Sequence, residues 1–393
     1  MKKQNRILIC IICISFVQMA TNGISAILAN IQSYYSTYSA SIIQFLMTFP
    51  SLFIVLFTIV SAKLLHFFSK KKLIEFGLIC VIGSGILSFV GYQSLVILFV
   101  GAALLGVGVG FCASFAISLI SDHYAPNQRG KIVGIQTAAS NFGSMMMTFF
   151  GGFLALLGWH YNYFVYFLAI PGLLFTHFWL NDKKEEAQNQ SGMLQCTYSF
   201  KICLLIILFM FFFYVGPTSI AMLLAENGYT NASLAGSAAT LLLLGGTLSS
   251  LVFDSFEKKF NNYCLCIGFL LLAIGYICMG VGRNLIIIYM GCFLAGSSIS
   301  FVMPKCMLLI SMHEKKENVS IATAMAMASS NIGTLIAPVF TIICTNVFCT
   351  TNTIGRLNIA FIICTIIFVL GIVLIRVKGE IERLNRYIGD LLI

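Results

Sequence analysis

Residues 101–106 read GAALLG, and residues 291–296 read GCFLAG, 190 positions later. The same offset relates AASNFG at 138–143 to ASSNIG at 328–333, and it holds for a third stretch between them. One offset shared by three separate stretches indicates an internal duplication. We therefore expect one half of the chain to copy the other.

The composition places this duplication in a membrane. Hydrophobic residues make up 59% of the 393 positions and charged residues only 9%, although the net charge is +10. Soluble domains carry about 25% charged residues. These values exclude the soluble globular classes. Because backbone groups in lipid must be satisfied within their own segment, we predict an all-α membrane protein.

Twelve apolar runs approach or exceed the length of about 20 residues that crosses a bilayer as a helix. They lie near 7–29, 42–67, 73–92, 95–121, 131–158, 162–180, 201–225, 233–254, 262–282, 285–311, 319–347 and 355–376. The longest hydrophilic segment, 181–200, separates two groups of six. We predict an N-terminal six-helix bundle at 1–180, a cytoplasmic linker at 181–200, a C-terminal bundle at 201–376 and a cytoplasmic tail at 377–393. Since six is even, both copies point the same way, which makes a parallel pseudo-repeat.

The basic residues set the expected orientation. If the runs cross the membrane alternately, all but two of the 23 Lys and Arg fall on one side. The exceptions are Arg283 and Arg356. This asymmetry follows the positive-inside rule and predicts that both termini are cytoplasmic. The tail is expected either to lie on the inner membrane surface as an amphipathic helix or to be disordered.

The sequence offers little for catalysis or metal binding. Nearly all of the 14 cysteines lie in apolar runs, as packing residues do. No two histidines are four residues apart, and no phosphate-binding Gly-Lys loop occurs. We expect no catalytic residues, no metal, no cofactor and no nucleic-acid partner, so the chain is not expected to be an enzyme.

Several short segments follow the predicted spans in a familiar order. Residues 62–72 read AKLLHFFSKKK and residues 250–259 read SLVFDSFEKK. Arg129-Gly130 and Gly158-Trp159-His160 follow the fourth and fifth spans. With the duplication, these segments resemble the major facilitator superfamily, whose signature after helix 2 is roughly G-x-L-x-D-R/K-x-G-R-K. The resemblance covers nearly the whole chain and implies a secondary transporter with a cavity between its halves.

The resemblance also implies a cytoplasmic gate, in which charge pairs latch the loops after helices 2 and 8. The residues it assigns are His66, Lys70, Lys71, Lys72, Arg129, Asp254 and Lys258. His66 stands near the acidic position of the first loop, whereas Asp254 keeps the acid in the second. The alternative is that the basic residues only anchor helix ends.

In this family helices 1, 4, 7 and 10 line the substrate cavity, with helices 2, 5, 8 and 11 beside them. The polar residues at those depths are Gln18, Asn22, Gln44, Ser114, Gln136, Asn141, Tyr214, Thr218, Lys305 and Asn331. An amide in lipid either faces the cavity or bonds across helices. Asn141 and Asn331 occupy matching repeat positions, which favours packing. Gln18, Asn22 and Gln136 have no such copies and are better candidates for substrate contact.

Charge inside the membrane is scarce. All 13 Asp and Glu are expected in loops or at helix ends, so proton coupling lacks its usual interior carboxylate. Lys305, eight residues before His313, lies roughly 12 Å below the loop at about 1.5 Å per residue. We expect it to have no carboxylate partner. It either contacts an anionic substrate or extends to the cytoplasmic surface.

We predict a monomeric transporter in the plasma membrane that moves a small organic solute, with an anion as one candidate, by uniport or exchange. Helix 5 keeps Gly143, Gly151 and Gly152, but Met147-Thr148 replaces the central Gly-Pro of an exporter signature. The direction of transport therefore stays open. A drug-type exporter and a membrane sensor that moves nothing are the alternatives.

Overall fold

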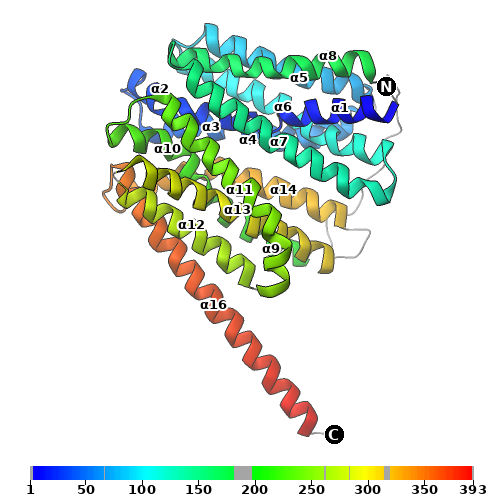
Figure 1. Ribbon diagram of the computed structural model, residues 1–393, viewed down its shortest axis with the longest axis vertical. Helices are drawn as coiled ribbons and strands as arrows, with labels where there is room; N and C mark the ends of the chain where they lie inside the picture. The colour runs from blue at the N-terminus through cyan, green and yellow to red at the C-terminus, as the bar shows by residue number, and fades with distance from the viewer. Residues whose placement is uncertain are drawn as a thin grey trace.

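The structure is a computed structural model that describes residues 3–65, 67–180, 197–260, 263–282, 284–313 and 319–391. Within these residues every regular element is a helix, which confirms the predicted all-α class. Figure 1 shows the N-terminal half (residues 3–180) stacked against the C-terminal half (residues 197–391).

The N-terminal half begins with a helix that is broken twice, and further helices follow it. Its elements are α1 (Lys3–Phe16), η1 (Ala20–Ile27), α2 (Leu28–Tyr34), α3 (Ala40–Thr48), α4 (Pro50–Leu64), α5 (Lys70–Val90), α6 (Leu95–His123), α7 (Pro126–Leu154), η2 (Trp159–Ala169) and α8 (Ile170–Trp179).

The C-terminal half has a comparable order and ends in the longest helix. Its elements are α9 (Thr197–Phe213), α10 (Val215–Glu226), α11 (Ala232–Phe260), α12 (Cys264–Val281), α13 (Leu285–His313), α14 (Val319–Ile336), α15 (Val339–Asn346) and α16 (Thr353–Leu391). In Figure 1, α16 leaves the body of the molecule and projects beyond it.

Ten stretches of the described chain are long and apolar enough to cross a membrane. They are Gln4–Tyr34, Ala40–Ser61, Lys70–Val90, Leu95–Ile120, Ser199–Glu226, Ala232–Phe260, Cys264–Val281, Leu285–Ile310, Ala322–Asn346 and Thr353–Ile375. The two other predicted spans coincide with α7 and with η2–α8. Polar residues and glycines interrupt the apolar sequence of α7, and η2 includes Asn162 among its aromatic residues.

The breaks between elements are satisfied by side chains from neighbouring helices. At the α9–α10 junction, the buried Tyr276 hydroxyl donates to the Phe213 carbonyl and accepts from the Gly216 N–H, both at 3.1 Å. In η1, the Gly23 carbonyl accepts from Asn162 Nδ2 at 3.0 Å. Such bonds allow irregular backbone at membrane depth, because they supply partners to backbone groups at the breaks.

Two glycines bring the first helix of each half close to a later one. A Cβ added at Gly143 in α7 would lie 2.0 Å from the Phe16 carbonyl oxygen, at the end of α1. A Cβ added at Gly333 in α14 would lie 2.6 Å from the Ile207 carbonyl oxygen in α9. Neither position has room for a side chain, so the helix backbones touch directly.

A second pair of glycines makes an equivalent approach. A Cβ at Gly106 in α6 would lie 2.3 Å from the Pro50 carbonyl oxygen, and one at Gly296 in α13 would lie 1.8 Å from the Leu242 carbonyl oxygen. Within each half, glycines therefore fix how closely the central helices pack.

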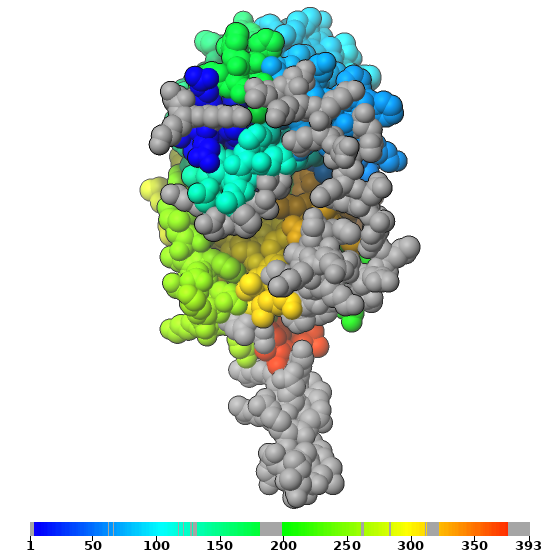
Figure 2. Space-filling view, turned by 90° about the vertical axis from the view of Figure 1, so that its right-hand side faces the viewer, coloured from blue at the N-terminus to red at the C-terminus, as the bar shows by residue number. Residues whose placement is uncertain are grey.

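We call the end at which α1 begins and α6 turns into α7 the N-terminal face, and the end that carries the α2–α3 and α10–α11 turns the opposite face. Across the two halves, α7 packs on α11, α4 on α14, and η1 on α10 and α11. Figure 2 looks onto the N-terminal face and shows a hollow between the halves.

Candidate functional site

The halves are tightly joined near the opposite face, where α7 crosses α11. A Cβ added at Gly152 would lie 3.2 Å from the Gly236 Cα, and one at Gly236 would lie 2.7 Å from the Thr148 carbonyl oxygen. One turn deeper, the hydroxyls of Thr148 and Thr240 are 3.1 Å apart. This contact leaves no passage between α7 and α11 at that level.

Gln44 adds a polar link between the same two halves. Its side chain is fully buried on α3, and its Nε2 donates to the Thr218 carbonyl at 3.3 Å and lies 3.5 Å from Ser219 Oγ on α10. Its Oε1 accepts from the Thr341 hydroxyl on α15. One amide from the N-terminal half thus contacts two elements of the C-terminal half.

A pocket with an empty volume of about 310 Å³ lies between the halves. It is lined by Asn22, Ser25, Met47 and Thr148 of the N-terminal half and by Phe213, Tyr214, Pro217, Ile220, Ala239, Leu242 and Leu243 of the C-terminal half. We call this space the interhalf pocket.

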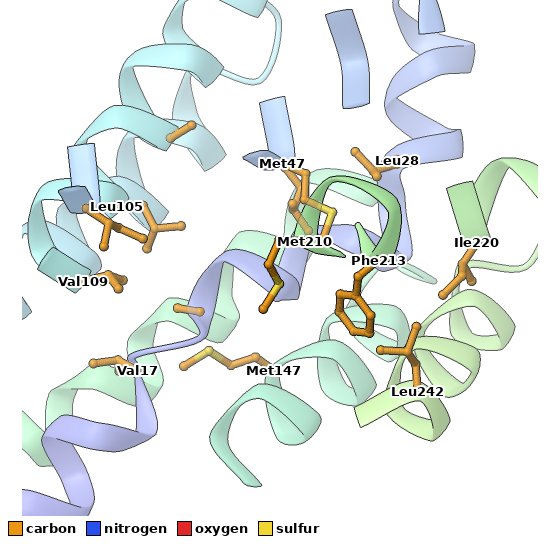
Figure 3. Close-up of a cluster of buried hydrophobic side chains, with 14 of the residues drawn as sticks. Val17, Leu28, Met47, Leu105, Val109, Met147, Met210, Phe213, Ile220 and Leu242 are labelled. Atoms are coloured by element: carbon orange, nitrogen blue, oxygen red, sulfur yellow. The ribbon is translucent and has the colours of Figure 1, made fainter. Parts of the chain in front are cut away.

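Most of the C-terminal wall of the interhalf pocket is apolar. Figure 3 shows Phe213, Ile220 and Leu242 gathered near one another, with Met47 above them. They come from α9, α10, α11 and α3, so the wall forms only when these elements meet. Such a wall suits the apolar face of a ligand.

The N-terminal wall of the interhalf pocket carries polar groups. Asn22 Nδ2 donates to Ser144 Oγ on α7 at 3.0 Å. Ser25 is 2% exposed, and its hydroxyl has no hydrogen-bond partner among the described residues. Asn22 and Tyr214 are therefore the sequence-predicted cavity residues that line this pocket. Ser25 was not among them, and no amide marks its position in the sequence.

Gln18 and Gln136 meet in a separate cluster between α1 and α7. Gln136 Nε2 donates to Gln18 Oε1 at 2.6 Å, and Ser140 Oγ donates to the same oxygen at 2.9 Å. Gln18 Nε2 is buried and has no partner among the described residues. The structure brings these two predicted residues together, but they do not line the interhalf pocket.

Three other predicted cavity residues bond within their own helices. Ser114 donates to the Gly110 carbonyl at 2.8 Å, Thr218 Oγ1 to the Tyr214 carbonyl at 2.8 Å, and Asn331 Nδ2 to the Met327 carbonyl at 3.0 Å.

Asn141, which is half-buried, also does not line the interhalf pocket.

The expectation that Lys305 lacks a carboxylate partner is wrong. Its Nζ lies 2.8 Å from Glu257 Oε1, and the Lys305 side chain is only 3% exposed. The apolar run predicted that the helix ends near residue 254, before Glu257. In the structure α11 continues to Phe260. Glu257 therefore stands on the last turns of α11, opposite α13. The pair lies within the C-terminal half rather than in the interhalf pocket.

The predicted gate residues form contacts at the N-terminal face. Lys70 pairs with Asp122 at 2.5 Å, which joins the start of α5 to the end of α6. Lys71 donates to the His177 carbonyl at 2.6 Å. Asp122 thus supplies an acid that the sequence analysis did not assign. Asp122 has an uncharged counterpart, Met312, in the second half. An acid present in only one copy of the repeat could have marked Asp122 as a candidate gate residue.

In the second gate loop, Asp254 pairs with Lys258 at 2.6 Å along α11, and both side chains are exposed.

In the first gate loop, Ser69 Oγ caps α5 by accepting from the Lys72 N–H at 3.4 Å. His66 and the side chain of Arg129 lie outside the described residues. Each described gate contact joins elements of one half.

The described part of the chain contains no group of three His, Cys, Asp or Glu that could hold a metal ion. The site is therefore a cleft between helices with amide, hydroxyl and apolar walls.

The sequence matches a known protein family, and the fold matches solved structures. Residues 8–195 and 202–385 match the profile of the Major Facilitator Superfamily. The chain belongs to this family. No match is found among curated protein sequences.

Solved structures of transporters share the fold at low sequence identity. A bacterial homologue of the human lysosomal transporter Spinster, in an inward-facing and unoccupied conformation, is 15% identical with a TM-score of 0.68, covering 95% of each chain. The nucleoside transporter NupG is 11% identical with a TM-score of 0.75, covering 93% of this chain and 99% of its own. A D-xylose–proton symporter is 15% identical with a TM-score of 0.69, covering 92% and 96%. This member of the major facilitator superfamily is therefore a multi-pass membrane protein with a transporter fold.

Proposed function

We propose that this protein is a secondary transporter that moves a small organic solute through the interhalf pocket by alternating access. The observation that supports this most directly is the asymmetry between its two faces. The halves touch through glycines, threonines and Gln44 near the opposite face, and a hollow separates them at the N-terminal face. A solute in the pocket would be released when the halves rock apart at one face and close at the other.

The proposal includes twelve spans in two six-helix bundles related by a parallel repeat. The glycine contacts support it: Gly143 approaches α1 as Gly333 approaches α9, and the two glycines are 190 positions apart. Gly106 and Gly296, also 190 apart, approach α4 and α11 in the same way. We assign α7 and η2–α8 as the fifth and sixth spans because they pack along α1 and α5. Both termini are then cytoplasmic, and the membrane is the plasma membrane.

Whether α7 and α8 span can be tested at the loop between them. Leu157 is 73% exposed and lies in this loop. In a twelve-span protein, a cysteine at Leu157→Cys reacts with a membrane-impermeant maleimide added outside intact cells, above the signal of the parent protein. A cysteine replacing Asn5, which is exposed near the N-terminus, reacts only after permeabilisation. Reaction of both only after permeabilisation would overturn the twelve-span assignment.

The structure supports uniport or exchange of an uncharged solute more than anion transport. The anion candidate depended on a Lys305 without a carboxylate partner, and Glu257 is 2.8 Å away. The residues that line the interhalf pocket carry no Asp, Glu, Lys or Arg. A drug-type exporter is the second candidate, favoured by the apolar wall of Phe213, Ile220 and Leu242.

Transport is tested by counterflow in proteoliposomes of known orientation. Vesicles are loaded with a defined mixture of sugars, nucleosides, dipeptides and apolar drugs, and the exchange of each isotope-labelled solute is measured by mass spectrometry. Exchange of at least one solute is expected, and it should be lost in Gly236→Val, which wedges the contact between α7 and α11. Stabilisation by a solute that is never exchanged would favour the membrane sensor instead and overturn transport.

A further inference from the structure

We infer that the interhalf pocket selects an uncharged solute with one polar edge and one apolar face, and that the Ser25 hydroxyl bonds the polar edge. This inference rests on the proposed function, because it names the solute class of the same site. It adds a specificity-determining residue that the amide pattern of the sequence did not single out.

The charge of the solute follows from the lining. All eleven lining residues are uncharged at neutral pH. An ion moved from water into such a pocket loses its hydration and finds no countercharge on the lining. A hydroxyl or amide loses less and can recover a hydrogen bond from the pocket. The lining therefore disfavours anions and cations alike.

The polar groups of the interhalf pocket are not equally available. Asn22 donates to Ser144, and the Thr148 hydroxyl contacts Thr240 and the Ser144 carbonyl. Ser25 alone among the lining residues has a buried hydroxyl without a partner in the described structure. Buried polar atoms normally have a partner, and an unpartnered one that lines a pocket is positioned to bond a ligand. Ser25 is 2% exposed, so bulk solvent does not serve it.

The apolar face of the solute follows from the facing wall. Met47, Phe213, Ile220, Leu242 and Leu243 line the interhalf pocket from four different elements. A ring or short alkyl group against this wall would be removed from water, and burial of apolar area is the main attraction available there.

The test uses two matched pairs of probes that differ mainly in charge: phenyl β-glucoside with phenyl β-glucuronide, and benzamide with benzoate. Binding to the purified full-length protein is measured by thermal shift and by titration calorimetry. The neutral member of at least one pair should raise the melting temperature by mass action, and its charged partner should not. Equal or tighter binding of the charged members, or binding of none of the four, would overturn the inference.

Two serine variants separate a contact with the solute from a general effect of burial. Ser25→Ala should weaken the binding of the neutral probe by about tenfold, as expected for one lost hydrogen bond. Ser15→Ala is the matched control, because Ser15 is also buried and without a described partner but does not line the pocket. It should bind with wild-type affinity. Unchanged binding in Ser25→Ala would show that a water, rather than a solute, satisfies this hydroxyl.

Failure of this inference and failure of transport give different results. A neutral probe that binds but is never exchanged across proteoliposomes leaves the solute class standing and removes transport. A charged solute that is exchanged while no neutral probe binds leaves transport standing and removes the solute class.

Discussion

At the scale of single residues, Gln44 joins the two halves by bonding both α10 and α15. Gln44→Met keeps the length but removes the amide, so Thr341 loses its acceptor and the Thr218 carbonyl loses a donor. Each buried group left without a partner costs about 1–3 kcal/mol. We expect a clear fall in melting temperature in detergent. Gln128→Met, at an exposed position on α7, is the control and should melt like the wild type.

A second residue-scale prediction concerns the buried ion pair. Lys305→Ala leaves the Glu257 carboxylate, 20% exposed, without its 2.8 Å partner. Breaking a buried pair costs about 3–5 kcal/mol, whereas replacing both members by uncharged groups is often neutral. Lys305→Ala should therefore unfold at a lower temperature than the double variant Lys305→Met/Glu257→Gln. A double variant as unstable as Lys305→Ala would show that the lysine stem, and not the charge pair, stabilises α13.

These residues also show how far sequence reasoning reaches. A polar side chain in an apolar run is visible in the sequence, so Gln44, Asn22 and Tyr214 could be selected. Their partners could not be found, because Gln44 bonds residues 174 and 297 positions away. Glu257 was missed because the end of α11 was placed six residues early, and a serine such as Ser25 carries no signal of its burial.

At the scale of elements, the close approach of α1 and α7 depends on Gly143. Gly143→Ala places a methyl group 2.0 Å from the Phe16 carbonyl, where the rigid backbone cannot yield, so the helices must separate. Overpacking of this kind costs about 1–3 kcal/mol or more. Gly134→Ala, on the same helix, meets nothing within 4 Å and gains up to about 1 kcal/mol of helix propensity. Thermal denaturation should rank Gly134→Ala at or above the wild type and Gly143→Ala well below it.

The elements themselves were only partly predictable. Apolar length locates most spans, and the family match supports the identity of the fold. Length does not locate the irregular backbone of η1 or the break at Tyr214, because Asn162 and Tyr276 from other helices bond backbone groups there. Prolines are the clear local signals, since proline cannot donate to the helix: Pro50 stands at the α3–α4 break, Pro171 at the η2–α8 break and Pro338 at the α14–α15 break.

At the scale of the whole molecule, the sequence does not predict which face is open between the two halves. The duplication predicts two halves around a cavity, but it says nothing about which face is open. That choice depends on a small difference in free energy between two packings of the same halves. If the halves rock as proposed, contacts such as Gly152 against Gly236, which join the halves near the opposite face, contribute to this difference.

Disrupting the α7–α11 contact should therefore shift the protein toward conformations in which the opposite face is open. Gly236→Val places a branched side chain where a single Cβ already lies 2.7 Å from the Thr148 carbonyl, so α7 and α11 can no longer close. Hydrogen–deuterium exchange by mass spectrometry should rise around residues 227–233 and in η1, at the opposite face. At the N-terminal face, near the Lys70–Asp122 pair, exchange should fall or stay unchanged. Gly134→Val, which meets no neighbour within 4 Å, controls for the added side chain. If both variants exchange alike at both faces, the α7–α11 contact is not what holds the opposite face shut.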